Sequence, residues 1–158
     1  MTGTFIIRPP EAEDIPGIRA VVKACEPLIM TYIPYYYWIN VRYFGDTCAV
    51  AVQDGKIVGW CCILAVPGGR HFVHQLGVAP EARGRGLSQE IVSYLFRKLK
   101  AKGKPEIELT IERGNEHVKR LFGRVAEGLG MKLTEQPDRI KVLEEEYNES
   151  LYVIKEAA

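Results

Sequence analysis

The stretch Leu-Gly-Val-Ala-Pro-Glu-Ala-Arg-Gly-Arg-Gly-Leu-Ser, residues 76–88, joins a strand-like run to a helix through a basic, glycine-rich turn. Gly84 and Gly86 can adopt positive φ, which lets a ligand approach the backbone closely. A helix that opens near Ser88 directs unpaired N–H groups and its positive dipole end at an anion. The turn is therefore a candidate pyrophosphate site, although a solvated turn between a strand and a helix can have the same composition.

The flanking residues indicate a strand before this turn and a helix after it. Residues 71–78 read as a strand, and apolar residues then recur every three to four positions from Leu87 to Leu99. This period is typical of a helix with one buried face. A P-loop is excluded because no Gly-Lys-Ser/Thr follows, and the Rossmann glycine spacing is also absent.

Arg83-x-x-Gly86-x-Ser88 resembles the Arg/Gln-x-x-Gly-x-Gly/Ala signature of the GNAT superfamily of N-acetyltransferases. The resemblance implies that the turn binds the pyrophosphate of acetyl-CoA, the co-substrate, and that the preceding strand pairs with the pantetheine arm. Asn115-x-x-Val118-x-x-Leu121-Phe122 is similar to a second motif of this superfamily, whose final tyrosine is here a phenylalanine. The implied cofactor-binding residues are Leu76, Gly77, Val78, Arg83, Gly84, Arg85, Gly86, Leu87, Ser88, Asn115 and Phe122.

Hydrophobic periodicity and turn residues predict eleven elements in the order β-α-α-β-β-β-α-β-α-β-β. Asp14 is expected to cap the first helix, Pro34 to open the second, and Asp54-Gly55 to turn a hairpin. Closing strands are expected at residues 131–134 and 150–155. The order predicts an α+β (mixed α/β) fold and matches the GNAT fold, in which a mostly antiparallel sheet splays between its fourth and fifth strands to admit acetyl-CoA.

Composition limits the number of domains and the kinds of partner that the chain is expected to have. A chain of 158 residues with 47% hydrophobic content suits a single domain over residues 1–158. The net charge of +1, with acids and bases interspersed, gives no sign of nucleic-acid binding or of a basic membrane-binding face. No apolar run approaches the ~20 residues that span a bilayer, and no secretory signal is evident. We expect a cytoplasmic protein with a small-molecule partner.

The four cysteines do not form a metal-binding motif. Cys25, Cys48, Cys61 and Cys62 lack Cys-x-x-Cys spacing, and neighbouring strand residues such as the last two point to opposite faces. We expect reduced, mostly buried thiols and no metal site.

Several segments together resemble one branch of the superfamily, the diaminobutyrate acetyltransferases of ectoine biosynthesis. They are residues 46–51, 72–75, 79–84, 115–122 and 149–151. The resemblance is weaker where specificity is expected to lie. The Asp and Asn of that family fall on Met30 and Tyr32, its two tyrosines on Tyr35 and Tyr37, and its tryptophan on His74. The reaction class therefore carries over better than the substrate.

Amine acetylation requires a base, because a free primary amine with a pKa near ~10.4 is protonated at neutral pH. His74 is the first candidate, since strict alternation would put it on the face of Leu76 and Val78. Glu149 or an ordered water is the alternative. The resemblance implies that Tyr35 protonates the leaving thiolate. The acceptor pocket is expected to involve Met30, Tyr32, Tyr36 and Trp38.

The sequence thus predicts an acetyl-CoA-dependent N-acetyltransferase that acts on a small primary amine by direct attack in a ternary complex. Two alternatives remain open. One is a transferase for a protein, peptide or antibiotic amine, and the other is a non-catalytic acyl-CoA-binding module. A homodimer is possible, because relatives are often dimers.

Overall fold

The computed structural model describes residues 4–158, so the first three residues of the expected domain lie outside it. The elements follow the predicted order. They are β1 (Ile6–Arg8), α1 (Ile15–Ala24), α2 (Pro34–Phe44), β2 (Cys48–Gln53), β3 (Lys56–Val66), β4 (Arg70–Val78), α3 (Leu87–Lys100), β5 (Glu106–Glu112), α4 (Glu116–Gly128), β6 (Met131–Val142) and β7 (Glu145–Glu156). The predicted α+β class is confirmed.

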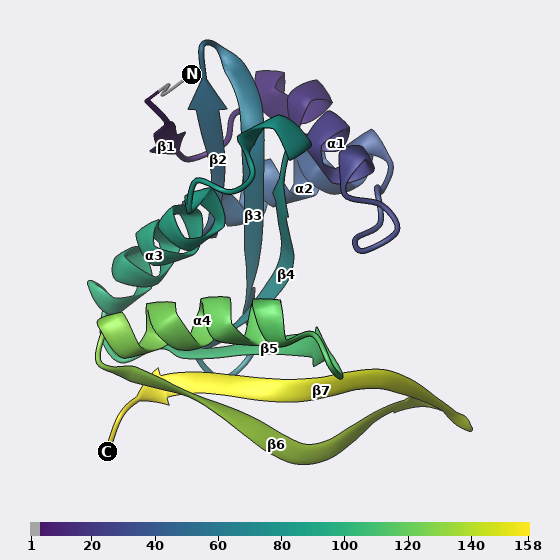
Figure 1. Cartoon of the computed structure of the whole chain (residues 1–158), viewed down its shortest axis with the longest axis vertical. Coiled ribbons are helices and arrows are strands. Elements are labelled where there is room, and N and C mark those ends of the chain that lie inside the picture. Colours follow the sequence, from purple (N-terminus) through teal and green to yellow (C-terminus); the bar gives the residue numbers. More distant parts are fainter. Residues whose placement is uncertain (1–3) are drawn as a thin grey trace.

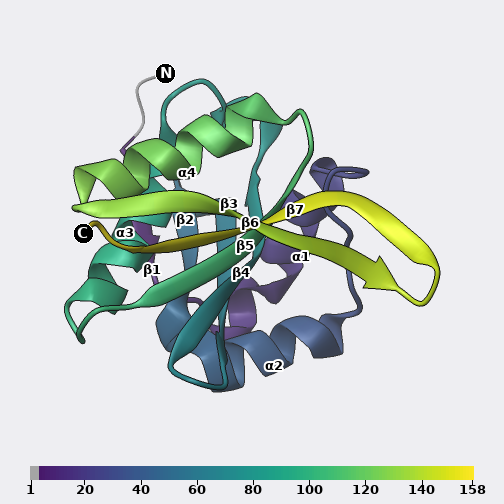
Figure 2. The ribbon, with the colours of Figure 1, turned by 90° about the horizontal axis from the view of Figure 1, so that it is seen from below.

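One seven-stranded sheet organises the molecule, with strand order β1-β2-β3-β4-β5-β7-β6 (Figure 1). Every neighbouring pair is antiparallel except β4 and β5, which are parallel. Helices α2 and α4 lie on opposite sides of the strands (Figure 2). One core cluster packs under α3 and α4, and a second packs under α1 and α2. Within residues 4–158, no helix has the length and apolar character needed to cross a membrane.

The β2–β3 hairpin forms at the predicted dipeptide. Asp54 and Gly55 both have positive φ, 51° and 75°. Two such residues match the twist of the flanking strands, which explains the strong hairpin signal of Asp-Gly. This hairpin places Cys61 in the core cluster under α3 and Cys62 in the cluster under α1 and α2. The expectation that these thiols point to opposite faces is confirmed, and all four cysteines are free and buried.

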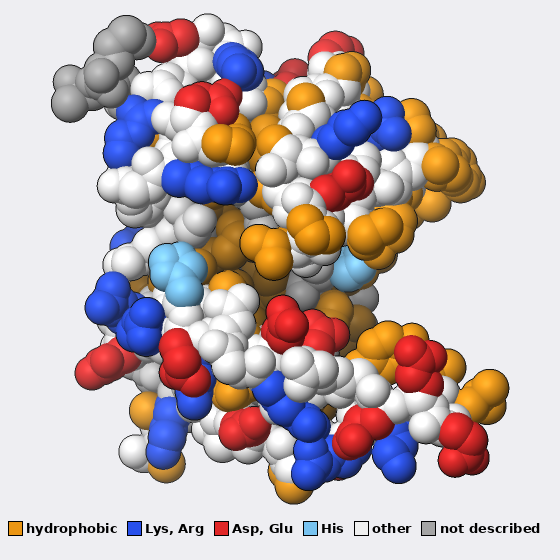
Figure 3. Space-filling view, turned by 45° about the vertical axis from the view of Figure 1, so that its right-hand side comes forward, with side chains coloured by type: hydrophobic (Ala, Val, Ile, Leu, Met, Phe, Trp, Pro, Cys, Tyr) orange, Lys and Arg blue, Asp and Glu red, His pale blue; other side chains and the backbone are white. Residues whose placement is uncertain are grey.

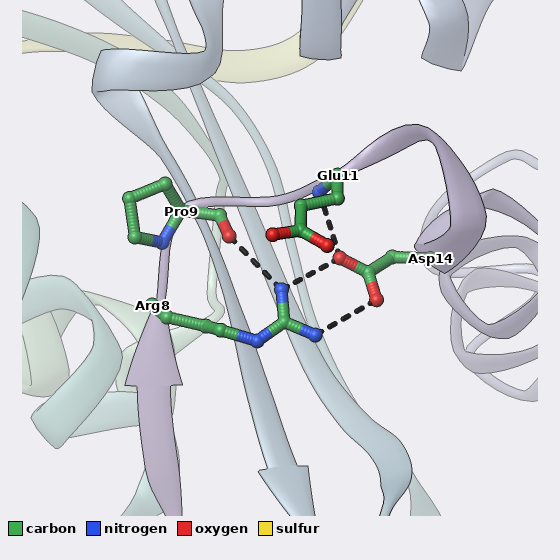
Figure 4. Close-up of polar contacts among 4 residues, drawn as sticks. All are labelled: Arg8, Pro9, Glu11 and Asp14. Carbon is green, nitrogen blue, oxygen red and sulfur yellow. Dashed lines mark hydrogen bonds and ion pairs between the residues drawn. The ribbon is translucent and has the colours of Figure 1, made fainter.

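The start of α1 differs from the prediction at Asp14. Its side chain does not cap α1. The carboxylate instead accepts two hydrogen bonds from Arg8, at 2.7 and 2.9 Å, and a third from the backbone N–H of Glu11 at 2.7 Å (Figure 4). A bidentate guanidinium is a stronger partner for a carboxylate than a helix N–H group, and this preference explains the difference. The contact ties β1 to the entry of α1.

The closing strands are longer than predicted. The structure has β6 over residues 131–142 and β7 over residues 145–156, so both strands extend well beyond the expected residues 131–134 and 150–155. Most of the added residues are exposed, which removes the alternation of buried and exposed positions on which the prediction relied. Ladder hydrogen bonds and an ion pair between Arg139 and Glu146, at 3.6 Å, hold this distal hairpin.

The parallel pairing of β4 with β5 is short, and this opens the sheet. Only residues 70–72 of β4 pair with β5, at residues 106–108. From Val73 to Val78 the edge of β4 that faces β5 has no strand partner. Figure 3 shows the molecule hollowed between its upper half, with α1 and α2, and its lower half, formed by β5–β7. Hydrophobic side chains lie in the depth of this hollow.

Candidate active site

The glycine-rich turn lies at the N-terminus of α3 and presents open backbone. Gly84 and Gly86 have φ of 78° and 73°, a region that favours glycine. Gly86 is the N-cap of α3 and supplies no side-chain cap, so the first N–H groups of the helix lack a protein side-chain partner at this position. A Cβ added at either glycine would meet no atom within 4 Å. The turn therefore has both the donors and the space that an anion requires.

The two arginines of the turn are engaged with the protein. Arg83 Nε donates to the Val78 carbonyl at 3.1 Å, and its guanidinium lies 3.6 Å from Cys25 Sγ. Arg85 donates to Gln53 and to the Glu81 carbonyl, and it also covers the ring of Phe5. Both side chains thus contact other parts of the protein. The sequence indicated the charge but not these contacts.

The last residues of β4 pack against both core clusters, one on each side of the sheet. Leu76 and Val78 pack with the cluster under α3. Gly77 faces the other side, where an added Cβ would lie 3.1 Å from Ile29 and 3.2 Å from Cys25. A side chain at this position would require Ile29 and Cys25 to shift by a few tenths of an ångström, so α1 and the following loop approach β4 closely here.

A β-bulge in β4 places His74 on a different face from the predicted one. Val73 pairs with Ile63 and Gln75 pairs with Cys62, so His74 is the extra residue between two consecutive pairs. A bulge of this kind re-aims one side chain and shifts the alternation that follows. The expectation that His74 shares a face with Leu76 and Val78 is wrong, because its contacts are with residues on the α2 side.

His74 lies in an aromatic cluster at the splayed edge of β4. Its Nδ1 atom is hydrogen-bonded to the Tyr36 hydroxyl. The Tyr32 ring stacks on the imidazole with 5.9 Å between centroids, and the Phe72 ring lies 6.4 Å away. Burial lowers the pKa of His74 below its usual value and raises the pKa of Tyr36 strongly. At neutral pH the imidazole is therefore uncharged and the phenol keeps its proton.

Tyr35 and Trp38 lie apart from this cluster. Tyr35 is 63% exposed and stacks on Trp38 at 5.9 Å, and Trp38 in turn contacts Tyr43 edge to face. These three rings form an exposed row on α2. Tyr36, expected only as a wall of the acceptor pocket, is the tyrosine of this helix that contacts His74.

A buried glutamine that sequence reasoning missed holds the loop before α2. Gln75 accepts hydrogen bonds from Trp60 Nε1 at 3.1 Å and from the Tyr37 hydroxyl at 3.3 Å. Its amide nitrogen donates to the Met30 carbonyl at 2.8 Å. The bond fixes the loop that carries Met30 and Tyr32. A polar residue at a buried strand position was the available signal, since such groups are nearly always hydrogen-bonded.

Three further candidates have clear local roles. Asn115, implied by the resemblance to bind the cofactor, caps α4 by accepting from the Val118 N–H at 3.2 Å. Phe122 is buried and packs on Phe96 in the core. Glu149 on β7 is half-buried and accepts from the Thr110 hydroxyl at 3.4 Å. Among residues 4–158, no group of three or more His, Cys, Asp or Glu side chains is arranged to hold a metal ion.

Comparison with known proteins agrees with this geometry. The model of the acetyltransferase (GNAT) family matches residues 18–126. The chain belongs to that family.

Curated relatives support the narrower resemblance. L-2,4-diaminobutyric acid acetyltransferase of Chromohalobacter salexigens is 35% identical over 127 residues, which cover 78% of this chain and 66% of the relative. The enzyme of the same name from Nocardia farcinica is 31% identical over 85% of this chain and 70% of its own length. The alignments thus span about two thirds of the length of these relatives. The resemblance to diaminobutyrate acetyltransferases is confirmed.

Solved structures confirm the fold. Diaminobutyrate acetyltransferase of Paenibacillus lautus, in complex with L-2,4-diaminobutyric acid and coenzyme A, superposes with a TM-score of 0.81 at 25% identity. The match covers 97% of this chain and 95% of that one. The ribosomal-protein-S18-alanine N-acetyltransferase of Escherichia coli has a TM-score of 0.70 at 16% identity, over 97% of this chain and 93% of that one.

Proposed function

We propose that this protein is an acetyl-CoA-dependent N-acetyltransferase that acetylates a primary amino group of a small molecule. The observation that carries the proposal is the short β4–β5 pairing beside an uncapped helix N-terminus. A ligand with an anionic group and an extended arm fits these two features together. The anion meets the N–H groups of the turn, and the arm lies along the free edge of β4.

The residues present fit acetyl-CoA as co-substrate. Gly84, Gly86 and the first residues of α3, Leu87 and Ser88, offer backbone N–H groups to the pyrophosphate. The backbone of β4 from Leu76 to Val78 offers ladder groups to the pantetheine arm, in the manner of strand addition. When bound, acetyl-CoA supplies the acetyl group as a thioester.

His74 is the proposed base. It lies beyond the last residue of β4 that pairs with β5, on a bulge that turns its ring toward α2. Because burial lowers its pKa, the imidazole is ready to accept a proton at neutral pH. The reaction then proceeds by direct attack of the neutral amine in a ternary complex, without an acyl-enzyme. Glu149, which pairs with Glu112 at one end of the β5–β7 ladder, is the proposed alternative base.

The acceptor is a small amine bound between this cluster and the loop that Gln75 holds. Similarity makes L-2,4-diaminobutyrate the first compound to test. By the resemblance, however, Met30 and Tyr32 take the positions of an acid and an amide of the related family. A second ammonium group would lose those partners, and an unpaired charge is costly to desolvate. We therefore propose a preference for monoamines or for longer or aromatic amines.

One screen tests both parts of the proposal. Thiol release from acetyl-CoA is measured with diaminobutyrate, ornithine, lysine, polyamines, arylalkylamines and short peptides. Release that depends on an amine supports the transferase function, and release with none of these amines contradicts it. If diaminobutyrate gives the highest kcat/KM, the proposed change of acceptor is wrong, whereas the transferase function stands.

A further inference from the structure

Three aromatic rings form a corner around the proposed base. The Tyr32 ring stacks on the His74 imidazole, with 5.9 Å between centroids and 23° between planes. The Tyr36 ring lies 4.6 Å from the Tyr32 ring, is tilted by 52° against it, and meets the imidazole edge to face. Tyr32 is 39% exposed, and the other two side chains are half-buried. Aromatic surface in this corner is therefore accessible to a ligand.

The backbone of Tyr32 is held on both sides. Its carbonyl accepts a hydrogen bond from Arg19 Nε of α1 at 3.1 Å, and its N–H donates to the Tyr37 hydroxyl of α2 at 3.4 Å. Two residues earlier in the chain, the Met30 carbonyl accepts from Gln75 of β4 at 2.8 Å. The ring is thus presented by a loop that is fixed to three elements. A surface that is ordered before binding loses less conformational entropy when a ligand binds.

The surroundings of this corner offer no partner for a second charge on a ligand. Burial lowers the pKa of His74, and no charged side chain of the described residues contributes to this shift. On β5, Glu108 lies opposite Phe72, and both of its carboxylate oxygens accept from Arg70, at 3.2 and 3.1 Å. An unpaired charge is costly to desolvate. The corner therefore favours an acceptor whose only charge is the reacting amino group.

Aromatic faces bind two kinds of chemical group. They attract an ammonium group, and they stack with another aromatic ring in an offset or tilted arrangement. Such a ring pair gains affinity beyond what the buried area alone supplies. A ligand that carries one ammonium group and one aromatic ring on a short chain uses both interactions at once.

We propose that Tyr32 is the specificity-determining residue for the acceptor, and that the acceptor is an arylalkylamine, a single primary amino group on a short chain that ends in an aromatic ring. The proposal rests on the transferase function proposed above and narrows its acceptor. The aromatic ring of the acceptor stacks on the accessible surface of Tyr32. Its ammonium group lies against the Tyr36 and His74 rings, where the imidazole takes its proton.

Calorimetric titration of the whole chain, saturated with coenzyme A, tests the class of acceptor without any reaction. The ligands are 2-phenylethylamine, 2-cyclohexylethylamine, which has the same chain and a saturated ring, and 2,4-diaminobutyrate. We expect phenylethylamine to bind about 2- to 10-fold more tightly than the cyclohexyl compound, because only the aromatic ring stacks. Diaminobutyrate should bind more weakly than either. No preference for the aromatic ring, or tighter binding of diaminobutyrate, would overturn the proposal.

Two substitutions at Tyr32 test its role in the same titration. Tyr32→Phe keeps the ring and should bind phenylethylamine like the unmodified protein. Tyr32→Leu should bind it about 2- to 10-fold more weakly, with little change for the cyclohexyl compound and an unchanged affinity for acetyl-CoA. The matched control is Tyr43→Leu, which removes an exposed ring of α2 outside the corner and should change none of these affinities. A Tyr32→Leu variant that still prefers the phenyl over the cyclohexyl compound would refute the role of Tyr32.

Thiol release from acetyl-CoA, measured on the same samples, separates this proposal from the function on which it rests. Release that depends on an amine, but is no faster with phenylethylamine than with the cyclohexyl compound, would overturn the arylalkylamine assignment and leave the transferase function intact. Binding that prefers phenylethylamine and requires Tyr32, without thiol release, would overturn the transferase function and leave the binding specificity intact.

Discussion

At the scale of single residues, the orientation of the His74 ring is set by the local backbone of β4. One extra residue in β4 turns its ring out of the regular alternation and into contact with Tyr36 and Tyr32. Without the bulge, strict alternation back from Val78 and Leu76, which pack on the α3 side of the sheet, would place His74 on that side as well. The bulge thus brings a titratable ring to the opened edge of the sheet.

His74→Gln separates chemistry from binding at this position. Glutamine keeps polarity and approximate size but cannot accept the amine proton, so kcat should fall by about 10²–10⁴-fold. Affinity for acetyl-CoA, measured by calorimetry, should stay the same. The residual rate should rise with pH, because more of the amine is neutral as pH approaches its pKa of ~10.4. Unaltered turnover with an unaltered pH profile would assign His74 a purely structural role.

At the scale of elements, the loop between α1 and α2 is positioned by one strand residue. Gln75 connects the Met30 carbonyl with Trp60 and Tyr37, so it fixes the loop against β4. Gln75→Leu leaves the indole N–H and the carbonyl without a partner, and the loss of stability should be about 1–3 kcal/mol. The KM for the amine should rise more than the KM for acetyl-CoA, as steady-state kinetics can measure. Equal effects on both would contradict a role specific to the acceptor loop.

The entry of α1 is tied down by the ion pair of Arg8 and Asp14. The hydrogen bonds from Arg8 lower the pKa of the Asp14 carboxyl in the folded protein. Its contribution to stability is therefore present above the pKa of the unfolded carboxyl, ~3.9, and is lost as pH falls through the lower folded value. Asp14→Ala should cost about 1–3 kcal/mol at neutral pH, measured by urea denaturation. The difference from the unmodified protein should shrink below pH ~4, and a difference that stays constant there would be inconsistent with this account.

At the scale of the whole molecule, the sequence predicted the fold wherever a pattern was local. The Asp54-Gly55 hairpin, the Pro34 helix start and the α3 stripe depend on neighbouring residues, and all formed as expected. The length of the β6–β7 hairpin could not be predicted from the sequence, because most of its added residues are exposed and show no alternation of hydrophobic and polar side chains. The partner of Asp14 was also missed, since Arg8 competes with the helix for the same carboxylate.

The candidate site shows the same division between local parts, which the sequence predicted, and parts that depend on distant contacts, which it did not. The glycine turn is local, and its backbone lies open at the start of α3 as the pattern indicated. The surroundings of His74 depend on a register shift between β3 and β4, which no local pattern in the chain announces. The resemblance pointed to Tyr35 as the proton donor to the thiolate, whereas the tyrosine of α2 that contacts the His74 imidazole is Tyr36. The buried partners Gln75 and Asn40 are likewise set by contacts that are distant in sequence.

Acetyl-CoA affinity of Gly86→Glu, measured by calorimetry, tests the central claim most directly. A glutamate there adds a side chain and a negative charge where the pyrophosphate would meet the backbone. The matched control is Gly69→Glu, because Gly69 has the same φ of 73° and equally open space in the β3–β4 turn. We predict that Gly86→Glu loses acetyl-CoA binding, while Gly69→Glu binds like the unmodified protein and both stay folded by circular dichroism. Unchanged affinity in Gly86→Glu would contradict the assignment of this turn as the acetyl-CoA site.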